Sequence, residues 1–131
     1  MKTINVTAAV IRHDGKVLIC QRPEGRNCGL LWEFPGGKIE NGETGEQCIV
    51  RECREELGIT IQVDRELTDI THEYPERIVH LRFYLCEIVE GNPEKKEHNA
   101  LAWIALEEID QYEFCPADRE MLKVNALGGL I

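Results

Sequence analysis

Residues 37–59 read GKIENGETGEQCIVRECREELGI and carry the most informative pattern of the chain. Within this stretch, Thr44 followed three residues later by Gln47 forms a capping-box pattern, which is typical of a helix N-terminus. Gly58 directly follows Leu57, at the position where a left-handed residue commonly ends a helix. The sequence therefore predicts a helix from Thr44 to Leu57.

Three acids of this predicted helix fall on one side of the same turn. Residues three and four positions apart are neighbours on a helix, so Glu52, Glu55 and Glu56 crowd together. Like charges at this spacing are mildly destabilising by themselves. Two interpretations follow: a solvated ionic face in which Arg51 and Arg54 pair with the acids, or a site for Mg²⁺, which prefers oxygen ligands.

The same stretch resembles the Nudix box, Gly-x5-Glu-x7-Arg-Glu-U-x-Glu-Glu-x-Gly-U, in which U is a bulky aliphatic residue. Every fixed position matches: Gly37, Glu43, Arg51, Glu52, Glu55, Glu56, Gly58 and Ile59. The one soft departure is Cys53, where Leu or Ile is usual. The segments 32–38, 77–81 and 116–118 are similar to the MutT branch of this family. The resemblance implies an α/β fold, the Nudix α/β/α sandwich with a mixed central sheet, as one domain over residues 1–131.

The resemblance also implies an activity and a cofactor. Relatives of this branch hydrolyse a nucleoside triphosphate to the monophosphate and pyrophosphate, with oxidised dGTP and CTP-type nucleotides as substrates. Mg²⁺, or Mn²⁺, would be held by the Gly37 carbonyl together with Glu52, Glu55 and Glu56. Glu97 would be a further metal ligand or would help deprotonate the attacking water, and the alternative is an ordinary surface acid.

Supporting and substrate-binding roles follow from the same resemblance. Glu43 and Arg51 are expected to form an ion pair that fixes the loop against the helix, and the candidates for the general base are Glu52 and Glu97. Residues expected to bind the substrate are Arg22 and Lys38 at the phosphates, Phe34 at the base, Arg77, and Asp118. Phe34 is alternatively a core residue, and Asp118 alternatively caps the last helix.

Other parts of the chain show the alternation of β-strands. The predicted elements are strands over 4–10 and 16–21 joined by an Asp14-Gly15 hairpin turn, strands over 61–70, 77–88 and 100–106, and a helix over 117–127 with Leu122 and Leu127 facing inward. Within residues 77–88, four apolar side chains point one way: Val79, Leu81, Phe83 and Leu85.

Composition narrows the classes of partner. The chain has 131 residues, with 24 acidic and 15 basic side chains and a formal net charge of −9. An acidic surface repels polyanions, so we expect no nucleic acid polymer as partner. No apolar run approaches the roughly 20 residues of a membrane span, and no signal peptide is recognisable, so we expect a cytoplasmic protein. Its oligomeric state is expected to be a monomer or a homodimer. The six cysteines lack Cys-x-x-Cys spacing and are expected to be small core residues.

Two other functions remain to be weighed against the leading one. The first is a nucleotide sensor that binds without cleaving, although a sensor has no need for every glutamate of the box. The second keeps hydrolysis but changes the substrate to a nucleotide sugar, a dinucleoside polyphosphate or an RNA cap. The acidic charge disfavours RNA.

Overall fold

The computed structural model describes residues 2–124 and 127–128. The elements, in chain order, are β1 (Thr3–His13), β2 (Lys16–Gln21), β3 (Trp32–Glu33), β4 (Gly36–Lys38), α1 (Gly45–Leu57), β5 (Thr60–Glu73), β6 (Ile78–Glu90), β7 (Ala100–Ile104), the 3₁₀ helix η1 (Leu106–Gln111) and α2 (Pro116–Lys123). The strands form one sheet in the order β3-β2-β1-β6-β5, with β4 paired to β1 and β7 paired to β2. Because β1 and β6 are parallel and their other neighbours are antiparallel, the expected mixed sheet is confirmed.

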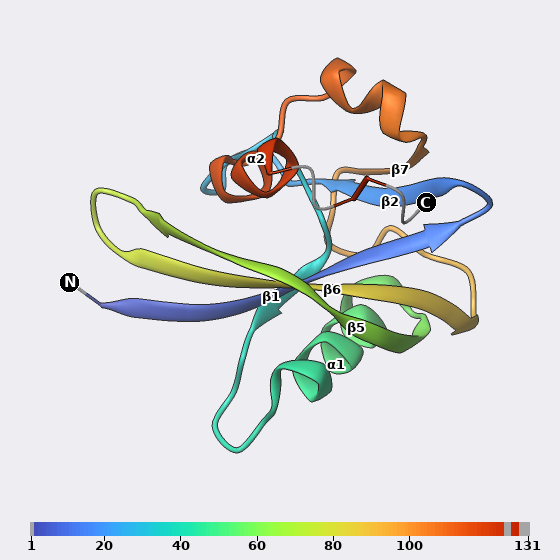
Figure 1. Cartoon of the computed structure of the whole chain (residues 1–131), viewed down its shortest axis with the longest axis horizontal. Helices are drawn as coiled ribbons and strands as arrows, with labels where there is room; N and C mark the ends of the chain where they lie inside the picture. Colours follow the sequence, from blue (N-terminus) through green and yellow to red (C-terminus); the bar gives the residue numbers. More distant parts are fainter. Residues whose placement is uncertain (1, 125–126, 129–131) are drawn as a thin grey trace.

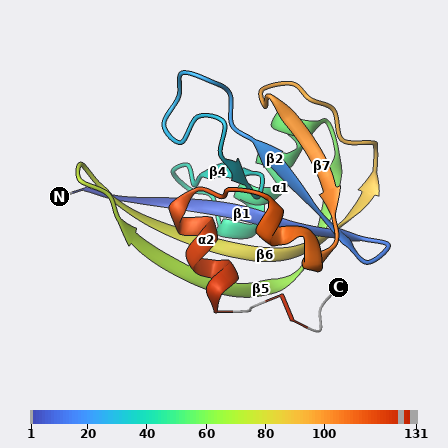
Figure 2. The same cartoon turned by 90° about the horizontal axis from the view of Figure 1, so that it is seen from above.

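Helices cover both faces of the sheet, as Figures 1 and 2 show, with α1 on one side and α2 on the other. The alternation along β6 divides the core between these faces. Leu81, Phe83 and Leu85 belong to the cluster that includes residues of α2. Tyr84 and Cys86 belong to the cluster that includes residues of α1. The prediction that the apolar side chains at alternate positions of this strand point one way is therefore confirmed.

Local signals fix two of the connections. At the start of α1, the Thr44 hydroxyl accepts a hydrogen bond from the Gln47 backbone N–H, and the Gln47 side chain bonds the Thr44 backbone N–H. Gly58 ends the helix with a φ of 69°, in the left-handed region. Asp14 and Gly15, with φ of 49° and 75°, form the hairpin turn between β1 and β2. The capping box, the helix end and the hairpin are all confirmed.

The C-terminal helix is shorter than the spacing of leucines predicts. It ends at Lys123, and the Val124 backbone N–H closes the last turn on the Met121 carbonyl. Leu127 is buried, but it lies outside the helix, and residues 125–126 of the predicted helix lie outside the described residues. Leu122 packs against the same core. Inward-facing leucines therefore do not require a continuous helix here.

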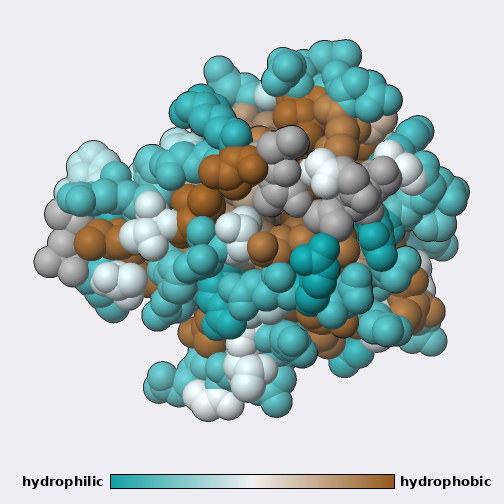
Figure 3. Space-filling view, viewed as in Figure 1, coloured by the Kyte–Doolittle hydropathy of each residue, from teal (hydrophilic) through white to brown (hydrophobic). Residues whose placement is uncertain are grey.

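The surface is mostly polar, and most of the cysteines are buried free thiols, as the sequence predicts. Polar residues cover most of the face shown in Figure 3, with smaller apolar areas between them. All six cysteines are free thiols, of which five are buried and Cys28 is half-buried. In the part of the chain that the structure describes, no helix is both long and apolar enough to cross a membrane.

Candidate active site

Arg51 joins α1 to the loop that precedes it. Its Nε and Nη2 atoms donate to the two carboxylate oxygens of Glu43, at 2.6 and 3.0 Å. Nη2 also donates to the Lys38 carbonyl, at 3.1 Å. The hydrogen bond from Arg51 lowers the pKa of Glu43 to about 2, so this carboxyl is ionised at neutral pH. The structure thus contains the ion pair expected of Glu43 and Arg51.

The same guanidinium also binds two of the three clustered acids. Nη1 of Arg51 donates to Glu52 at 2.8 Å and to Glu55, which is exposed, at 3.1 Å. Within residues 2–124 and 127–128, no three His, Cys, Asp or Glu side chains converge closely enough to form a metal-binding cluster. The three glutamates share one helical turn but do not meet at one point, because carboxylates repel one another and Arg51 offers two of them a positive partner.

Glu56 differs from its two neighbours. It accepts a hydrogen bond from the Gly36 backbone N–H, while its Oε1 atom is buried and has no partner among the described residues. Burial, together with the charges of Glu52, Glu33 and Glu97, raises the pKa of Glu56 to about 8. A buried acid oxygen without a partner costs free energy, and a cation placed against it would remove that cost. Glu56 is therefore the acid that most needs a counter-charge.

A glycine of β4 lies against the acid cluster (Glu52, Glu55 and Glu56 of α1). A β-carbon added at Gly37 would lie 2.4 Å from the Glu52 Cδ atom and 2.5 Å from its Oε2 atom. Only a residue without a side chain lets the carboxyl group of Glu52 lie against this part of β4. The carboxylates of Glu52 and Glu56, with the exposed Glu55 and Glu97 near enough to influence the Glu52 pKa, offer only oxygen atoms, which are the ligands that Mg²⁺ and Mn²⁺ prefer. The Gly37 carbonyl accepts from the Thr7 hydroxyl at 3.2 Å. The residues present therefore fit the expected cation.

We expect the metal-free protein to lose stability as pH rises, because burial raises the pKa of several of its acids. The pKa of Glu56 is about 8 in the folded chain against an ordinary value of 4.5, so the folded state binds the proton more tightly. Stability therefore falls between pH 4.5 and 8, by at most about 5 kcal/mol from this group. Burial also raises the pKa of Glu52 and Asp118, which act in the same direction. Denaturant titrations in chelator from pH 5 to 9 measure the fall, and Glu56→Gln should make it shallower; an unchanged slope would contradict the assignment.

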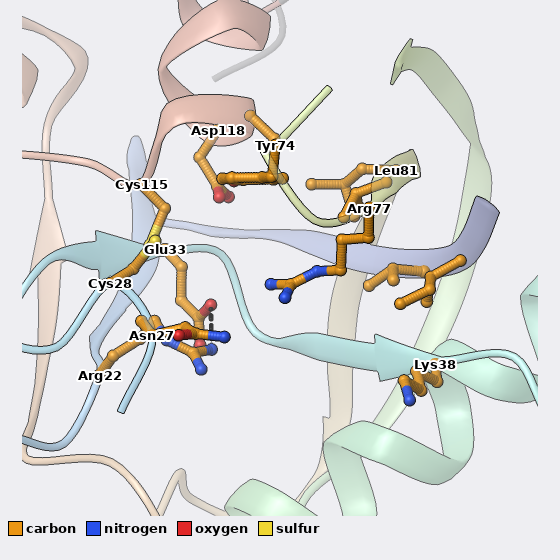
Figure 4. A pocket seen from close by; sticks show the side chains of 14 residues that line it. Arg22, Asn27, Cys28, Glu33, Lys38, Tyr74, Arg77, Leu81, Cys115 and Asp118 are labelled. Atoms are coloured by element: carbon orange, nitrogen blue, oxygen red, sulfur yellow. Dashed lines mark hydrogen bonds and ion pairs between the residues drawn. The ribbon is translucent and has the colours of Figure 1, made fainter. Parts of the chain in front are cut away.

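Four of the five residues expected to bind substrate line one cavity, of about 380 Å³. They are Arg22, Lys38, Arg77 and Asp118. Figure 4 shows Asp118 and Tyr74 together at one end of this cavity and Lys38 at the other. The cavity extends to the end of β4 that carries Lys38, one residue from Gly37. A single elongated ligand lying in the cavity can therefore extend past Lys38 toward the acids of α1.

Phe34 is not at the surface of this cavity. Its ring is 3% exposed, stacks on Phe114 with ring centroids 5.8 Å apart, and meets Phe83 edge-on at 6.2 Å. The expectation that this ring stacks on a base is wrong for this structure, and the core alternative holds, because neighbouring rings cover it. Its backbone N–H, however, donates to the Asp118 Oδ1 atom at 3.1 Å.

Asp118 lies in the first turn of α2 and is 5% exposed. Burial, reinforced by the charge of Glu33, raises the pKa of Asp118 well above its usual range. A protonated carboxyl has one O–H donor and retains acceptor capacity, so it resembles an amide in its hydrogen bonding. This acid can therefore donate to a base and accept from it.

Two residues that the sequence did not single out complete the cavity. Tyr74 lies at the tip of the β5–β6 hairpin, and the guanidinium of Arg77 lies 5.2 Å from its ring centroid. Glu33 on β3 accepts from Arg22 at 3.1 Å. An aromatic residue directly before Pro75, between the predicted strands 61–70 and 77–88, was a usable signal for Tyr74. No local signal marked Glu33, since its partners are distant in sequence.

Comparisons with known proteins agree with this geometry. A model of the NUDIX domain matches residues 6–124. The chain is 43% identical to CTP pyrophosphohydrolase of Escherichia coli K12 (94% of this chain, 91% of that protein) and 37% identical to 8-oxo-dGTP diphosphatase of the same organism (93% and 95%). The solution structure of the E. coli ORF135 protein is 41% identical and superposes with a TM-score of 0.83, covering 99% of this chain and 94% of that one. The crystal structure of a MutT NUDIX hydrolase from Burkholderia pseudomallei is 28% identical and superposes with a TM-score of 0.84, covering 94% of this chain and 98% of that one. The family model covers most of the chain, and both E. coli relatives exceed 30% identity over most of their length, so the chain belongs to the NUDIX family.

Proposed function

We propose that this protein is a divalent-metal-dependent hydrolase that converts a nucleoside triphosphate and water to the monophosphate and pyrophosphate. The observation that carries the proposal is Glu56, a half-buried acid whose Oε1 atom is buried without a partner among the described residues, on the helix that packs against β4, whose Lys38 lines the cavity. The names of the two E. coli relatives, CTP pyrophosphohydrolase and 8-oxo-dGTP diphosphatase, support a nucleoside triphosphate as the substrate.

The acids of α1 would act on the phosphate chain. Mg²⁺ or Mn²⁺, bound by Glu52, Glu56 and the Gly37 carbonyl with Glu55 and Glu97 beside them, would neutralise phosphate charge and make a water easier to deprotonate. A general base works best when its pKa lies near the working pH. Burial raises the pKa of Glu52, which keeps this acid a candidate for the base beside the exposed Glu97.

Basic side chains at the cavity would hold the phosphates. Arg22 is orientated by Glu33 and by a hydrogen bond from its Nε atom to the Asn27 carbonyl, at 2.7 Å. Lys38 is exposed and lies at the cavity next to Gly37, so its ammonium group can move toward a phosphate oxygen. Both cations line the cavity, so a polyphosphate lying in it would meet them.

The inner end of the cavity would hold the base. Asp118 supplies both a donor and an acceptor in its protonated form, and Tyr74 supplies an aromatic ring near it. Aromatic side chains stack on every base and so provide affinity rather than choice. The choice between oxidised guanine and cytosine-type bases would then depend on Asp118.

Replacing Asp118 with Asn tests this assignment. We expect the ratio of kcat/KM between 8-oxo-dGTP and CTP to change by about 10-fold or more, because loss of a matched buried hydrogen bond costs about 1–3 kcal/mol. Steady-state rates on both nucleotides measure the ratio. Lys123→Gln, an exposed change on the same helix and outside this cavity, is the control and should leave the ratio unchanged. An unchanged ratio in Asp118→Asn would show that another residue selects the base.

A substrate panel tests the proposed function as a whole. Pyrophosphate release should be measured with Mg²⁺ on CTP, dCTP, dGTP and 8-oxo-dGTP, with a nucleotide sugar and a dinucleoside polyphosphate as rival substrates. Turnover of a triphosphate to monophosphate and pyrophosphate is expected. Binding without turnover on every compound would instead favour a nucleotide sensor, and preference for a diphosphate derivative would move the substrate class.

A further inference from the structure

His98 is the buried residue in an otherwise exposed loop. Between β6 and β7, residues 94–97 and Asn99 are exposed, whereas His98 is 8% exposed as a residue and its side chain only 4%. The preceding residue is Glu97, the acid proposed to join the metal site. A histidine directed inward beside an acid directed outward requires a reason beyond the solubility of the loop.

The histidine ring is anchored to β3. Its Nε2 atom lies 3.2 Å from the Glu33 Oε2 atom, while the Oε1 atom of the same carboxylate accepts from Arg22 at 3.1 Å. Glu33 is therefore clamped between a residue of the loop and a residue that lines the cavity. The Nδ1 atom of His98 is buried without a hydrogen-bond partner among the described residues. Burying this nitrogen without a partner costs free energy, and the contact of the ring with Glu33 offsets part of that cost.

The next residue extends the anchor to β2. Asn99 donates from its backbone N–H to the Gln21 carbonyl at 2.9 Å and from its side chain to the Gln21 Oε1 atom at 2.6 Å. Glu97 immediately precedes these two fixed residues. The negative charge of Glu97 contributes to raising the pKa of both Glu52 and Glu56, so its carboxylate lies within electrostatic range of these two acids.

We propose that His98 is a positioning residue, whose anchor on Glu33 holds the Glu97 carboxylate toward the acids of α1. The inference rests on the proposed function for its meaning, since it assigns Glu97 to the metal site. The Glu33 carboxylate then links the two halves of the site: one oxygen holds Arg22 at the cavity, and the other holds the loop that carries Glu97. Loss of the anchor would let a loop of exposed residues carry Glu97 away from Glu52 and Glu56.

Two variants of His98 separate positioning from packing. His98→Leu fills the buried space but cannot donate to Glu33, whereas His98→Gln retains an N–H donor near the position of Nε2. We expect His98→Leu to weaken Mn²⁺ binding in the absence of nucleotide by about 10-fold or more, as losing a partner that orientates a ligand commonly does. The Mg²⁺ concentration for half-maximal activity should rise in parallel, with a smaller change in KM for the nucleotide. His98→Gln should restore most of both.

Isothermal titration with Mn²⁺, a Mg²⁺ titration of activity and the thermal midpoint are measured for each variant. Lys95→Ala, an exposed change in the same loop, is the control and should match the wild type. A lower thermal midpoint in His98→Leu with unchanged Mn²⁺ affinity and unchanged Mg²⁺ dependence would make His98 a packing residue and overturn the proposal. If the wild type hydrolyses no nucleotide, the proposed function fails, while the Mn²⁺ affinities still decide the role of His98.

Discussion

Replacing Glu56 with Gln is expected to lower kcat by about 100-fold or more, the loss typical of removing a main electrostatic element of a catalytic site. Gln retains the size of the side chain and an oxygen that can accept from the Gly36 N–H. It cannot become a negatively charged ligand, so the cation that would hold the phosphates loses its most buried partner. KM for the nucleotide should change less, because the cavity and its basic residues are untouched. Glu52→Gln is expected to act in the same direction.

The matched control for this change lies on the same helix. Glu46 is in the first turn of α1 and is exposed, so Glu46→Gln removes one charge without touching the acid cluster. Circular dichroism and the thermal midpoint verify that the three variants fold, and single-turnover rates with Mg²⁺ measure the chemical step. Glu56→Gln should be at least as stable as the wild type at pH 8 in chelator, since a neutral side chain suits its burial. Near-normal rates in both Glu56→Gln and Glu52→Gln would remove these acids from the site.

Most of the fold was predictable because it depends on local rules. The capping box at Thr44, the αL residue Gly58 and the Asp14-Gly15 turn each follow from the conformational preferences of two or three neighbouring residues. The alternation along β6 predicted which apolar side chains share one face, because successive residues of a strand point to opposite faces; the structure adds that α2 covers that face. The error at the C-terminal helix arose because the spacing of Leu122 and Leu127 was read as helical, whereas Leu127 is buried outside the helix.

The site was predictable only in part, for a different reason. The ion pair of Glu43 and Arg51 spans eight residues of one motif, so the resemblance located it. Phe34 was assigned to the base because the sequence does not show that Phe83 and Phe114 cover its ring. Contacts between distant segments decide whether an aromatic residue faces a cavity or the core.

Glu33 and His98 show the same limit for charged groups. Their contact joins residues 65 positions apart, and neither residue has a local pattern that indicates a partner. The acids of α1 were found from sequence, and one interpretation already paired Arg51 with them, but the sequence did not show how its guanidinium is divided. Arg51 was expected to support the loop through Glu43, yet it also holds Glu52 and Glu55. Only the folded chain shows how one cation is shared among these acids.

The same substitution should affect the two adjacent glycines of β4 differently: activity at Gly37 and stability at Gly36. Gly37→Ala is expected to keep the fold and to lower kcat by about 100-fold or more, because it disturbs the electrostatic site. Its β-carbon would meet the Glu52 carboxyl group at 2.4 Å, and the end of a flexible side chain can move aside. Gly36→Ala is expected to destabilise the protein by about 3 kcal/mol or more, as overpacking against an immovable neighbour does. Its β-carbon would lie 1.9 Å from the Thr7 backbone oxygen, which the pairing of β1 with β4 holds in place.

Denaturant titrations and single-turnover rates on the two variants decide between a structural and a functional need for each glycine. Moving the Glu52 carboxyl away from β4 displaces one of the proposed ligands. Mn²⁺ affinity should therefore fall in Gly37→Ala while the free energy of unfolding in chelator changes little. If Gly37→Ala instead unfolds, the glycine is required by the sheet. If it folds and turns over normally, Glu52 does not need its place against β4, and the metal site must be built from other acids.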